Sequence, residues 1–220
     1  GLMYVKGTMY TVKRLSETHI VPNKSNITVE LLQDFYEEYL LPFEFVYYLK
    51  DGLKIRLKFN ENNFCHLLGL HYIRPNSSNF EVIRGAYGYK QIKTGNITFD
   101  YLESINKHQF ELNSNRIFYF PFIIRLLKNP INLVFDSTII NNCKINCDFL
   151  FYDEFNDVYI HLGISGNTKY FYPSTFLIEP IGNTYKGDKF IKNQKKIIIE
   201  KKEINLIENQ KIFKHKQNEL

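Results

Sequence analysis

Residues 44–70 read EFVYYLKDGLKIRLKFNENNFCHLLGL. In the first part of this stretch, Glu44 to Leu49 and Leu53 to Phe59 are rich in aromatic residues and alternate apolar with polar side chains. Between them, Lys50-Asp51-Gly52 supplies residues that tolerate the positive φ angles of a tight reversal. The pattern therefore predicts a β-hairpin.

The second part of the stretch predicts a short helix. Asn60 to Leu70 begins with asparagines that are able to cap a helix, and Phe64 and Leu67 lie on one apolar face. Gly69 is suited to end the helix, because glycine readily adopts the left-handed conformation found there. This helix would carry His66.

Helices are predicted on both sides of the hairpin. Residues 27–41 have apolar side chains at helical spacing and are followed by proline. Residues 98–108 predict a capped helix, and residues 116–128 an apolar helix in which Pro121 is tolerable only near the first turn. Residues 74–97 contain proline and three glycines, and they read as an irregular connection that is a candidate binding loop.

The last part of the chain predicts strands. β-branched and aromatic residues dominate four segments separated by turns: 131–135, 145–152, 158–164 and 169–178. Helices followed by strands give an α+β fold, with an antiparallel sheet packed against helices on one face. The segment 190–205 is compatible with an additional strand or with a helix.

The positive charge of the chain is concentrated at one end. The formal net charge is +5, but residues 1–185 balance and the excess lies in the lysine-rich segment from Lys186 onward. We expect an N-terminal extension with one helix (1–43), a central domain (44–196) and a charged tail (197–220). Because charged tails are usually solvated, overall basicity is weak support for nucleic-acid binding.

The composition indicates a folded protein of the reducing cytoplasm. Hydrophobic residues make up 44% of the chain, no apolar run reaches the roughly 20 residues of a membrane span, and the start lacks a secretory signal. The three cysteines, Cys65, Cys143 and Cys147, do not form a disulfide framework and are expected as thiols. With His66 they could be imagined as a zinc site, but their spacing favours buried structural residues.

No familiar nucleotide-binding, zinc-protease or serine-hydrolase motif is present. What remains is a set of polar residues on otherwise apolar elements: His66, Tyr89, Lys90, Lys93, His161, Ser174 and Thr175. Cleavage of RNA without a metal ion needs a base for the 2′-hydroxyl, an acid for the leaving oxygen and cations around the phosphorane. Histidine, lysine and hydroxyl groups can fill these roles.

The sequence also resembles a known family. The run Leu57 to Leu70, with Phe64-Cys65-His66-Leu67-Leu68-Gly69-Leu70 at its end, is similar to the Phe-x-His-Leu-Leu-Gly-Leu hallmark of a phage-associated branch of the barnase, EndoU, colicin and RelE-like (BECR) nucleases. Further similarity occurs, in order, at Tyr89-Lys90-Gln91-Ile92, Gly95-Asn96-Ile97-Thr98, Asp148 to Tyr152, Ile160-His161-Leu162 and Pro173-Ser174-Thr175-Phe176. The resemblance spans Glu44 to Gln194.

The resemblance implies an RNA-cleaving activity in a toxin, phage-conflict or polyvalent-protein setting. The expectation that no metal ion or cofactor is needed comes from the polar residues themselves. By matched position the resemblance implies catalytic or phosphate-binding roles for His66, Lys90 and Thr175, and also for His161. Tyr89, Lys93 and Ser174 would contact the substrate. Thr175 stands where serine is usual, which keeps a hydroxyl but changes its rotamer preference.

Two classes of function follow. The first is a metal-independent endoribonuclease, with RNA as substrate and an antitoxin or immunity protein as a possible partner. The second is a non-catalytic RNA- or protein-binding module with the same fold. A further option is a phage structural or conflict protein whose nuclease site has decayed. His66 and Lys90 lying close together in space would favour the enzyme. Wide separation of the two, or a His66 buried in an apolar cluster, would favour the module.

Overall fold

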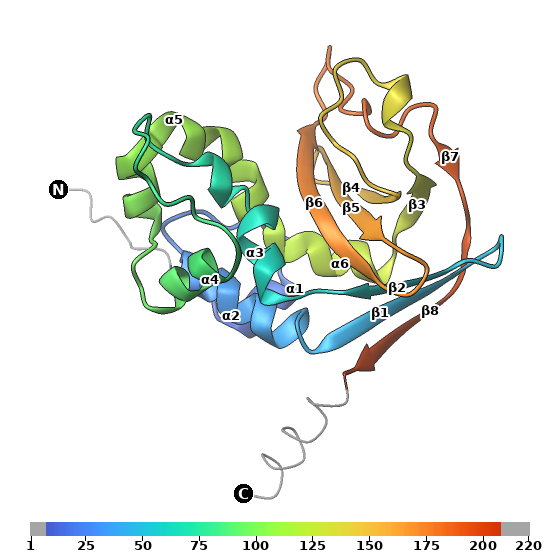
Figure 1. The fold of residues 1–220 in the computed structure, drawn as a ribbon, viewed down its shortest axis with the longest axis horizontal. Helices are drawn as coiled ribbons and strands as arrows, with labels where there is room; N and C mark the ends of the chain where they lie inside the picture. The colour runs from blue at the N-terminus through green and yellow to red at the C-terminus, as the bar shows by residue number, and fades with distance from the viewer. Residues whose placement is uncertain (1–7, 208–220) are drawn as a thin grey trace, which may run out of the picture. The chain divides into compact units, whose positions relative to one another are not determined.

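The computed structural model describes residues 8–207, which form two compact units (Figure 1). The helical unit comprises residues 8–38 and 61–124, and the sheet unit comprises residues 39–60 and 125–207. Each unit is thus assembled from two separate stretches of chain. The expected division of the chain into residues 1–43, 44–196 and 197–220 remains a prediction.

The helical unit contains most of the helices. They are α1 (Val12–Glu17), α2 (Val29–Tyr39), α3 (Glu61–Leu67), η1 (Leu70–Tyr72), α4 (Gly85–Lys93), α5 (Phe99–Phe118), η2 (Phe120–Phe122) and α6 (Ile123–Lys128), of which α2 and α6 extend into the sheet unit. The expected helices at 27–41 and 60–70 are confirmed as α2 and α3. Among the residues described, no helix has the length and apolar character to cross a bilayer.

Aromatic side chains hold the helical unit together. The ring of Phe64 on α3 lies 4.9 Å from that of Tyr36 on α2 and 5.9 Å from those of Tyr89 on α4 and Phe120 in η2. All four side chains are buried. Edge-on and tilted aromatic contacts of this kind add roughly 1 kcal/mol each to the burial of the rings, so Phe64 fixes the face that α3 turns inward.

Two expectations about the helices were wrong. Residues 74–97 are not a continuous loop, because Gly85–Lys93 forms α4. Gly88 within α4 packs against Cys65, and a Cβ at this glycine would lie 2.8 Å from the Cys65 sulfur. The expected helix 116–128 is interrupted, since α5 ends at Phe118 and the 3-10 turn with Pro121 precedes α6.

The sheet unit is built on eight strands. They are β1 (Phe43–Leu49), β2 (Lys54–Lys58), β3 (Ile131–Val134), β4 (Phe149–Phe155), β5 (Val158–Gly166), β6 (Phe171–Pro180), β7 (Lys195–Lys196) and β8 (Ile199–Leu206). The spatial order is β7-β3-β4-β5-β6-β2-β1-β8. The hairpin and the four expected strands are confirmed, and the fold is α+β.

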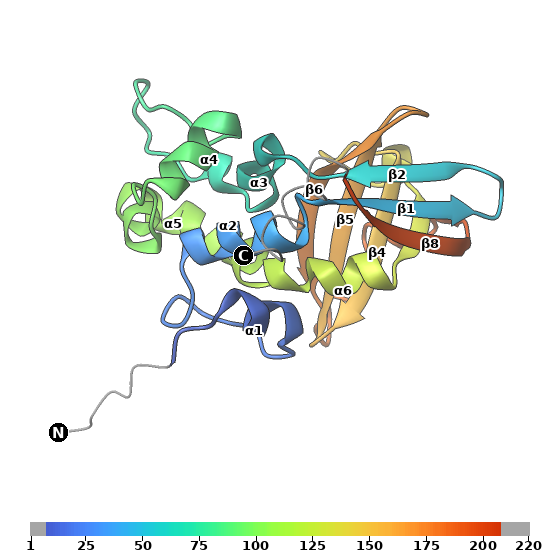
Figure 2. The ribbon, with the colours of Figure 1, turned by 90° about the horizontal axis from the view of Figure 1, so that it is seen from below.

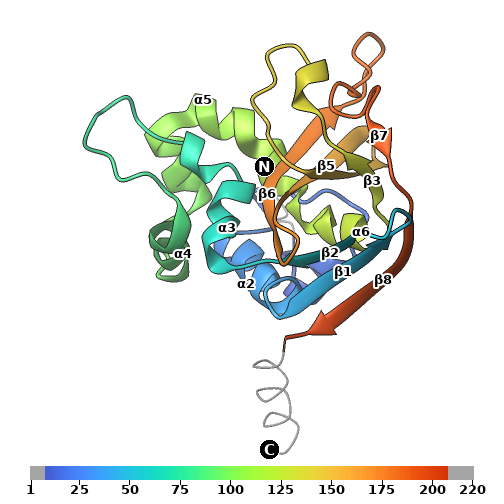
Figure 3. The same ribbon diagram turned by 45° about the vertical axis from the view of Figure 1, so that its right-hand side comes forward.

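The two ends of this strand order are consecutive in the chain. β7 pairs with β3 and β8 pairs with β1, and only residues 197 and 198 separate them. Ile197 N donates to Asn132 O, and Lys50 N donates to Ile198 O, so the linking residues are bonded to both neighbours as well. One continuous segment therefore joins the two edges of a curled sheet (Figures 1 and 3).

The sheet departs from the expectation in one respect and decides a point that the sequence left open. It is mixed instead of antiparallel, because β2 and β6 pair in parallel, through Leu57 and Phe171. The segment 190–205, which the sequence left open between strand and helix, forms β7 and β8. Part of the expected tail is thus a strand, and the remainder from residue 208 lies outside the described residues.

Within the sheet unit, one cluster packs on the inner face of the sheet and a second covers the outer face of β3 to β6. On the inner face, the rings of Tyr47 and Phe151 lie 4.8 Å apart. The Tyr47 hydroxyl donates to the carbonyl of Leu127 at the end of α6, the helix labelled in Figure 2. On the outer face, the segments 136–148 and 181–194 enclose a second cluster that includes Leu150, Cys147 and Phe190. Alternate residues of β4 to β6 therefore point into one core or the other.

Gly69 ends α3 in the left-handed conformation, with φ of 72°. A Cβ at this position would lie 2.6 Å from Asn113 Oδ1 and 3.2 Å from Arg116 Cδ, both on α5. Asn113 is buried and its amide Nδ2 donates to Gln109 O, so it has little room to move. Glycine is required here both for its backbone angle and for the close approach of α5.

We predict that Gly69→Ala lowers the free energy of unfolding by at least about 2 kcal/mol, because the left-handed strain of about 1 kcal/mol adds to the clash with Asn113. Gly95→Ala is the matched control, since Gly95 has φ of 78° but no atom within 4 Å of the added Cβ. It should lose only the strain. Urea unfolding of both variants tests this, and equal losses would show that the close approach is unimportant.

Candidate functional site

Two histidines stack at the end of α3. His66 lies in the last turn of that helix and is exposed, and His71 follows in η1. Their ring centroids are 4.4 Å apart and the rings are nearly parallel, at 18°. His66 faces outward because Phe64, Cys65 and Leu67 occupy the buried face of the helix. The left-handed turn at Gly69 then brings His71 alongside it.

Arg116 and Tyr72 complete a cluster with the two histidines. The Tyr72 ring lies 3.9 Å from that of His71, and the Arg116 guanidinium carbon lies 5.5 Å from the centroid of the Tyr72 ring. Arg116 also hydrogen-bonds the side chain of Tyr72. Arg116 extends from α5 and passes close to Gly69, where a Cβ would lie 3.2 Å from Arg116 Cδ. We call these four residues, His66, His71, Tyr72 and Arg116, the histidine cluster.

The electrostatics of the cluster favour a neutral His71. Burial, together with the nearby His66, Arg116 and Arg74, lowers the pKa of His71 to about 4. Its Nδ1 atom is buried, and no described residue hydrogen-bonds it. Burial also lowers the pKa of Arg116, against the effect of Tyr72, but an arginine remains protonated at neutral pH.

This arrangement has the parts needed for proton transfer beside an anion. A neutral imidazole can accept a proton, and a second imidazole in stacked contact can donate one, because protonation of either ring disfavours protonation of the other. The guanidinium can stabilise negative charge that develops on a phosphate. The half-exposed position of the cluster leaves it accessible from solvent.

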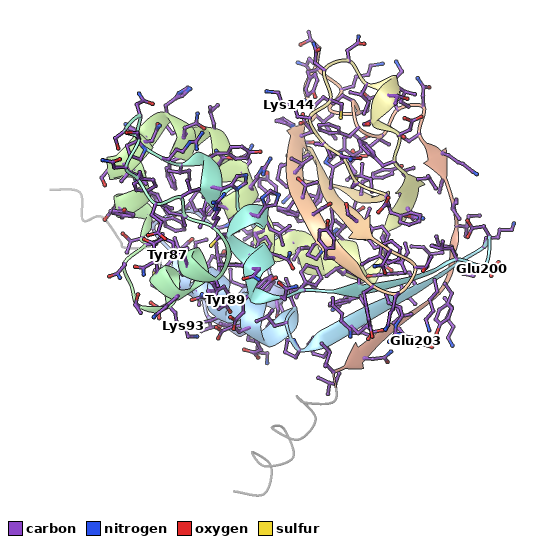
Figure 4. The ribbon with its side chains drawn as sticks, in the orientation of Figure 1. Tyr87, Tyr89, Lys93, Lys144, Glu200 and Glu203 are labelled. Carbon is purple, nitrogen blue, oxygen red and sulfur yellow. The ribbon has the colours of Figure 1, made fainter. Side chains whose placement is uncertain are left out.

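Three expected site residues lie on α4, which packs against α3 through Tyr89 on Phe64 and Gly88 on Cys65. Lys90 is exposed on this helix, which neighbours that of His66. Tyr89 is buried and donates to Glu37 Oε1 at 2.8 Å, and Lys93 bonds both oxygens of Glu37 at 2.8 Å (Figure 4). Tyr89 and Lys93 thus connect α4 to α2.

His161 is enclosed in the outer core of the sheet unit. It is fully buried, its ring meets that of Phe190 edge-on at 5.6 Å, and its Nδ1 lies 3.2 Å from Leu177 O. Burial lowers the pKa of His161 to about 4. An imidazole without solvent-exposed surface is not available to a substrate, so His161 reads as a core residue in this structure.

Ser174 and Thr175 lie on β6 at an irregularity in its pairing with β5, between Gly163 and Ile164. Both are partly buried. The Ser165 hydroxyl donates to that of Ser174 at 3.0 Å. Thr175 pairs with Gly163, where a Cβ would lie only 2.5 Å from the Thr175 methyl carbon. The two hydroxyl residues therefore belong to the sheet unit, while His66 and Lys90 belong to the helical unit.

His71, Tyr72 and Arg116 were missed from the sequence. The signal for His71 was its place directly after the His66-Leu67-Leu68-Gly69-Leu70 run, whereas nothing local distinguishes Arg116, which is 50 positions from His66. In the part of the chain that the structure describes, no three histidine, cysteine, aspartate or glutamate side chains gather as metal ligands would.

Comparison with known proteins identifies the family of this chain. The profile described as phage-Barnase-EndoU-ColicinE5/D-RelE like nuclease4 (PBECR4) matches residues 31–218. No curated protein and no solved structure matches the chain significantly. The matched range begins in α2 and extends past β8, so it takes in residues of both units. The chain therefore belongs to the phage-Barnase-EndoU-ColicinE5/D-RelE like nuclease 4 family.

Proposed function

We propose that this nuclease-family chain is a metal-independent endoribonuclease whose acid–base groups are His66 and His71. The observation that carries the proposal is the stack of the two imidazoles beside Arg116 and Tyr72. Pairs of titratable groups whose environments push their pKa values apart are the usual source of a general base and a general acid. The lowered pKa of His71 supports its assignment as the base.

In the proposed reaction, the neutral His71 takes the proton of the 2′-hydroxyl, and the hydroxyl oxygen attacks the adjacent phosphorus. His66 in its protonated form gives a proton to the departing 5′-oxygen. Arg116 stabilises the additional charge of the phosphorane, and Tyr72 holds the guanidinium in place. The products are a 2′,3′-cyclic phosphate and a free 5′-hydroxyl.

Lys90 is proposed to bind phosphate next to this cluster, because it is exposed on the helix that packs against α3. Ser174 and Thr175 remain proposed substrate contacts on the sheet unit, supported by the resemblance of Pro173-Ser174-Thr175-Phe176 to the family pattern. Tyr89 and Lys93 are better explained as positioning residues for α4, since both bind Glu37.

The alternative is a non-catalytic RNA- or protein-binding module. One observation favours it: three residues proposed for the site, His161, Tyr89 and Lys93, are buried or held by other side chains. The exposed His66 and the histidine cluster favour the enzyme. A toxin or phage-conflict role, restrained by an antitoxin or immunity protein, accompanies the enzymatic proposal.

The first test is cleavage of an end-labelled RNA in excess EDTA. We expect full activity and products that end in 2′,3′-cyclic phosphate, because the proposed acid, base and cation are all side chains. The cyclic ends are identified by their resistance to phosphatase until acid treatment opens them. Activity that vanishes with EDTA and returns with magnesium would contradict the mechanism, and no cleavage under any condition would favour the binding module.

The second test concerns the residues of the cluster. His66→Ala and His71→Ala are each expected to slow single-turnover cleavage by about 10² to 10⁴, the usual contribution of a general acid or base. Arg116→Gln should slow it as well, because charge on the phosphorane would lack its partner. His108→Ala is the control, since His108 is an exposed histidine on α5 outside the cluster. Near wild-type cleavage by a folded His71→Ala protein would refute the assignment.

The third test is the pH dependence of kcat/KM. Because the pKa of His71 is lowered to about 4, the base stays deprotonated through mildly acidic conditions. Activity should therefore fall on the acidic side near pH 4, and not near 6.5 as for an ordinary histidine. Arg74 is one of the cations that lower this pKa, so Arg74→Gln should move the acidic limb upward. A limb near 6.5 in the wild-type protein would rule out His71 as the base.

A further inference from the structure

The outer face of β8, β1 and β2 carries an unusual set of side chains. The strand register places Tyr48 between Lys54 on β2 and Lys201 on β8. The same register places Arg56 and Lys58 on this side of β2, opposite Val46 and Glu44 of β1. All these side chains point to the same side because residues alternate along a strand. The outer core that segments 136–148 and 181–194 enclose contains residues of β3, β4 and β6 and, among the described residues, none of β8, β1 or β2.

Two exposed tyrosines of β6 and its preceding turn continue this surface. Leu57 of β2 pairs with Phe171, so Tyr170 and Tyr172 flank Arg56 and Lys58 on the outer side. Tyr170 is 41% exposed and Tyr172 is 47% exposed. Ser174 follows two residues after Tyr172. Its hydroxyl accepts a hydrogen bond from Ser165, the residue of β5 that pairs with Tyr172. We call the surface from Lys201 to Tyr172 the hairpin face.

Cations and aromatic rings alternate on the hairpin face. The Lys58 ammonium lies 4.4 Å from the centroid of the Tyr170 ring, and the Arg56 guanidinium carbon lies 5.4 Å from it. At the other end, the ammonium groups of Lys54 and Lys201 lie 5.0 Å and 5.3 Å from the centroid of the Tyr48 ring. Cations over ring faces hold the tyrosines at the surface in defined positions.

The charge of the hairpin face is positive. It carries five cations, Lys54, Arg56, Lys58, Lys169 and Lys201. Two carboxylates oppose them, Glu44 and Glu203, of which Glu203 is labelled in Figure 4. Both Arg56 and Lys58 are ion-paired with Glu44, which lowers the pKa of that carboxyl group. Three positive charges remain in excess, on a chain whose residues 1–185 are balanced overall.

We propose that the hairpin face binds single-stranded RNA, with bases stacked on Tyr170 and Tyr48 and phosphates on the flanking cations. Single-stranded nucleic acids are bound by positive surfaces whose exposed aromatic rings accept the bases. An acidic protein segment would use the cations but would gain little from the tyrosines. The choice of RNA over DNA rests on the proposed function, whereas the binding of a single strand rests on the face itself.

The test is fluorescence anisotropy with a labelled 2′-O-methyl oligoribonucleotide of twelve mixed bases, which cannot be cleaved by 2′-hydroxyl attack. Arg56→Gln/Lys58→Gln should weaken binding about tenfold or more and reduce the salt slope by about 1.4, the value for two lost phosphate contacts on a single strand. Tyr170→Leu should weaken binding about tenfold, and Tyr170→Phe should keep it, because stacking needs the ring and not the hydroxyl.

A control variant and a second test variant complete the set. Lys144→Gln removes an exposed lysine at the opposite end of the sheet unit from Glu203 (Figure 4) and should leave binding unchanged. Lys54→Gln/Lys201→Gln lies at the exposed rim of the face and should weaken binding even if the Arg56 variant is unstable. Melting curves are recorded for every variant.

The outcomes separate this inference from the proposed function. If the folded variants Tyr170→Leu, Arg56→Gln/Lys58→Gln and Lys54→Gln/Lys201→Gln bind the oligonucleotide as the wild-type protein does, the proposal for the hairpin face is wrong, even if the wild-type protein cleaves RNA. Weakened binding by these variants supports the face, even if no cleavage occurs. Equal competition by a poly-glutamate peptide, together with normal binding by Tyr170→Leu, would identify an acidic-protein surface and overturn the proposal.

Discussion

The arrangement of the histidine cluster depends on the left-handed turn at Gly69. This turn ends α3, and the missing side chain lets α5 approach to a distance at which a Cβ would collide with Asn113. As a result Arg116 reaches the same place as the two histidines, although it lies far from them in the sequence. A short helix, a glycine and a long helix thus assemble a compact group of titratable side chains on a rigid support.

Most of the regular structure could be predicted from local patterns. The alternation in residues 44–59 and the apolar face of residues 60–70 were sufficient for the hairpin and for α3, and β-branched segments were sufficient for β3 to β6. The helix α4 was missed because Gly85 and Gly88 suggest a loop. Gly88 is instead helical and packs under Cys65, a tertiary contact that outweighs its low helix propensity and that no local pattern reveals.

The site was only partly predictable for a related reason. The sequence predicted a short helix that carries His66 and left open whether this side chain is exposed or buried. It is exposed in the structure, but chemistry also depends on which distant residues approach it. His161 alternates along β5 in a pattern that fits either face of a sheet, and only the segment carrying Phe190 decides that this face is covered. Tyr89 and Lys93 have side chains able to bind a substrate, but both donate hydrogen bonds to Glu37 on α2. Burial and pairing, not residue type, determine the role in each case.

The closure of the sheet by residues 195–206 has a consequence for synthesis on the ribosome. The helical unit ends at residue 124. All of its residues are therefore available once residue 124 has left the exit tunnel, and its local contacts can form early. The hairpin β1–β2, in contrast, is made early but waits for β8, which is more than 140 positions later in the chain. A growing chain therefore carries its histidine cluster long before it has the completed sheet against which Tyr48 and Arg56 are held.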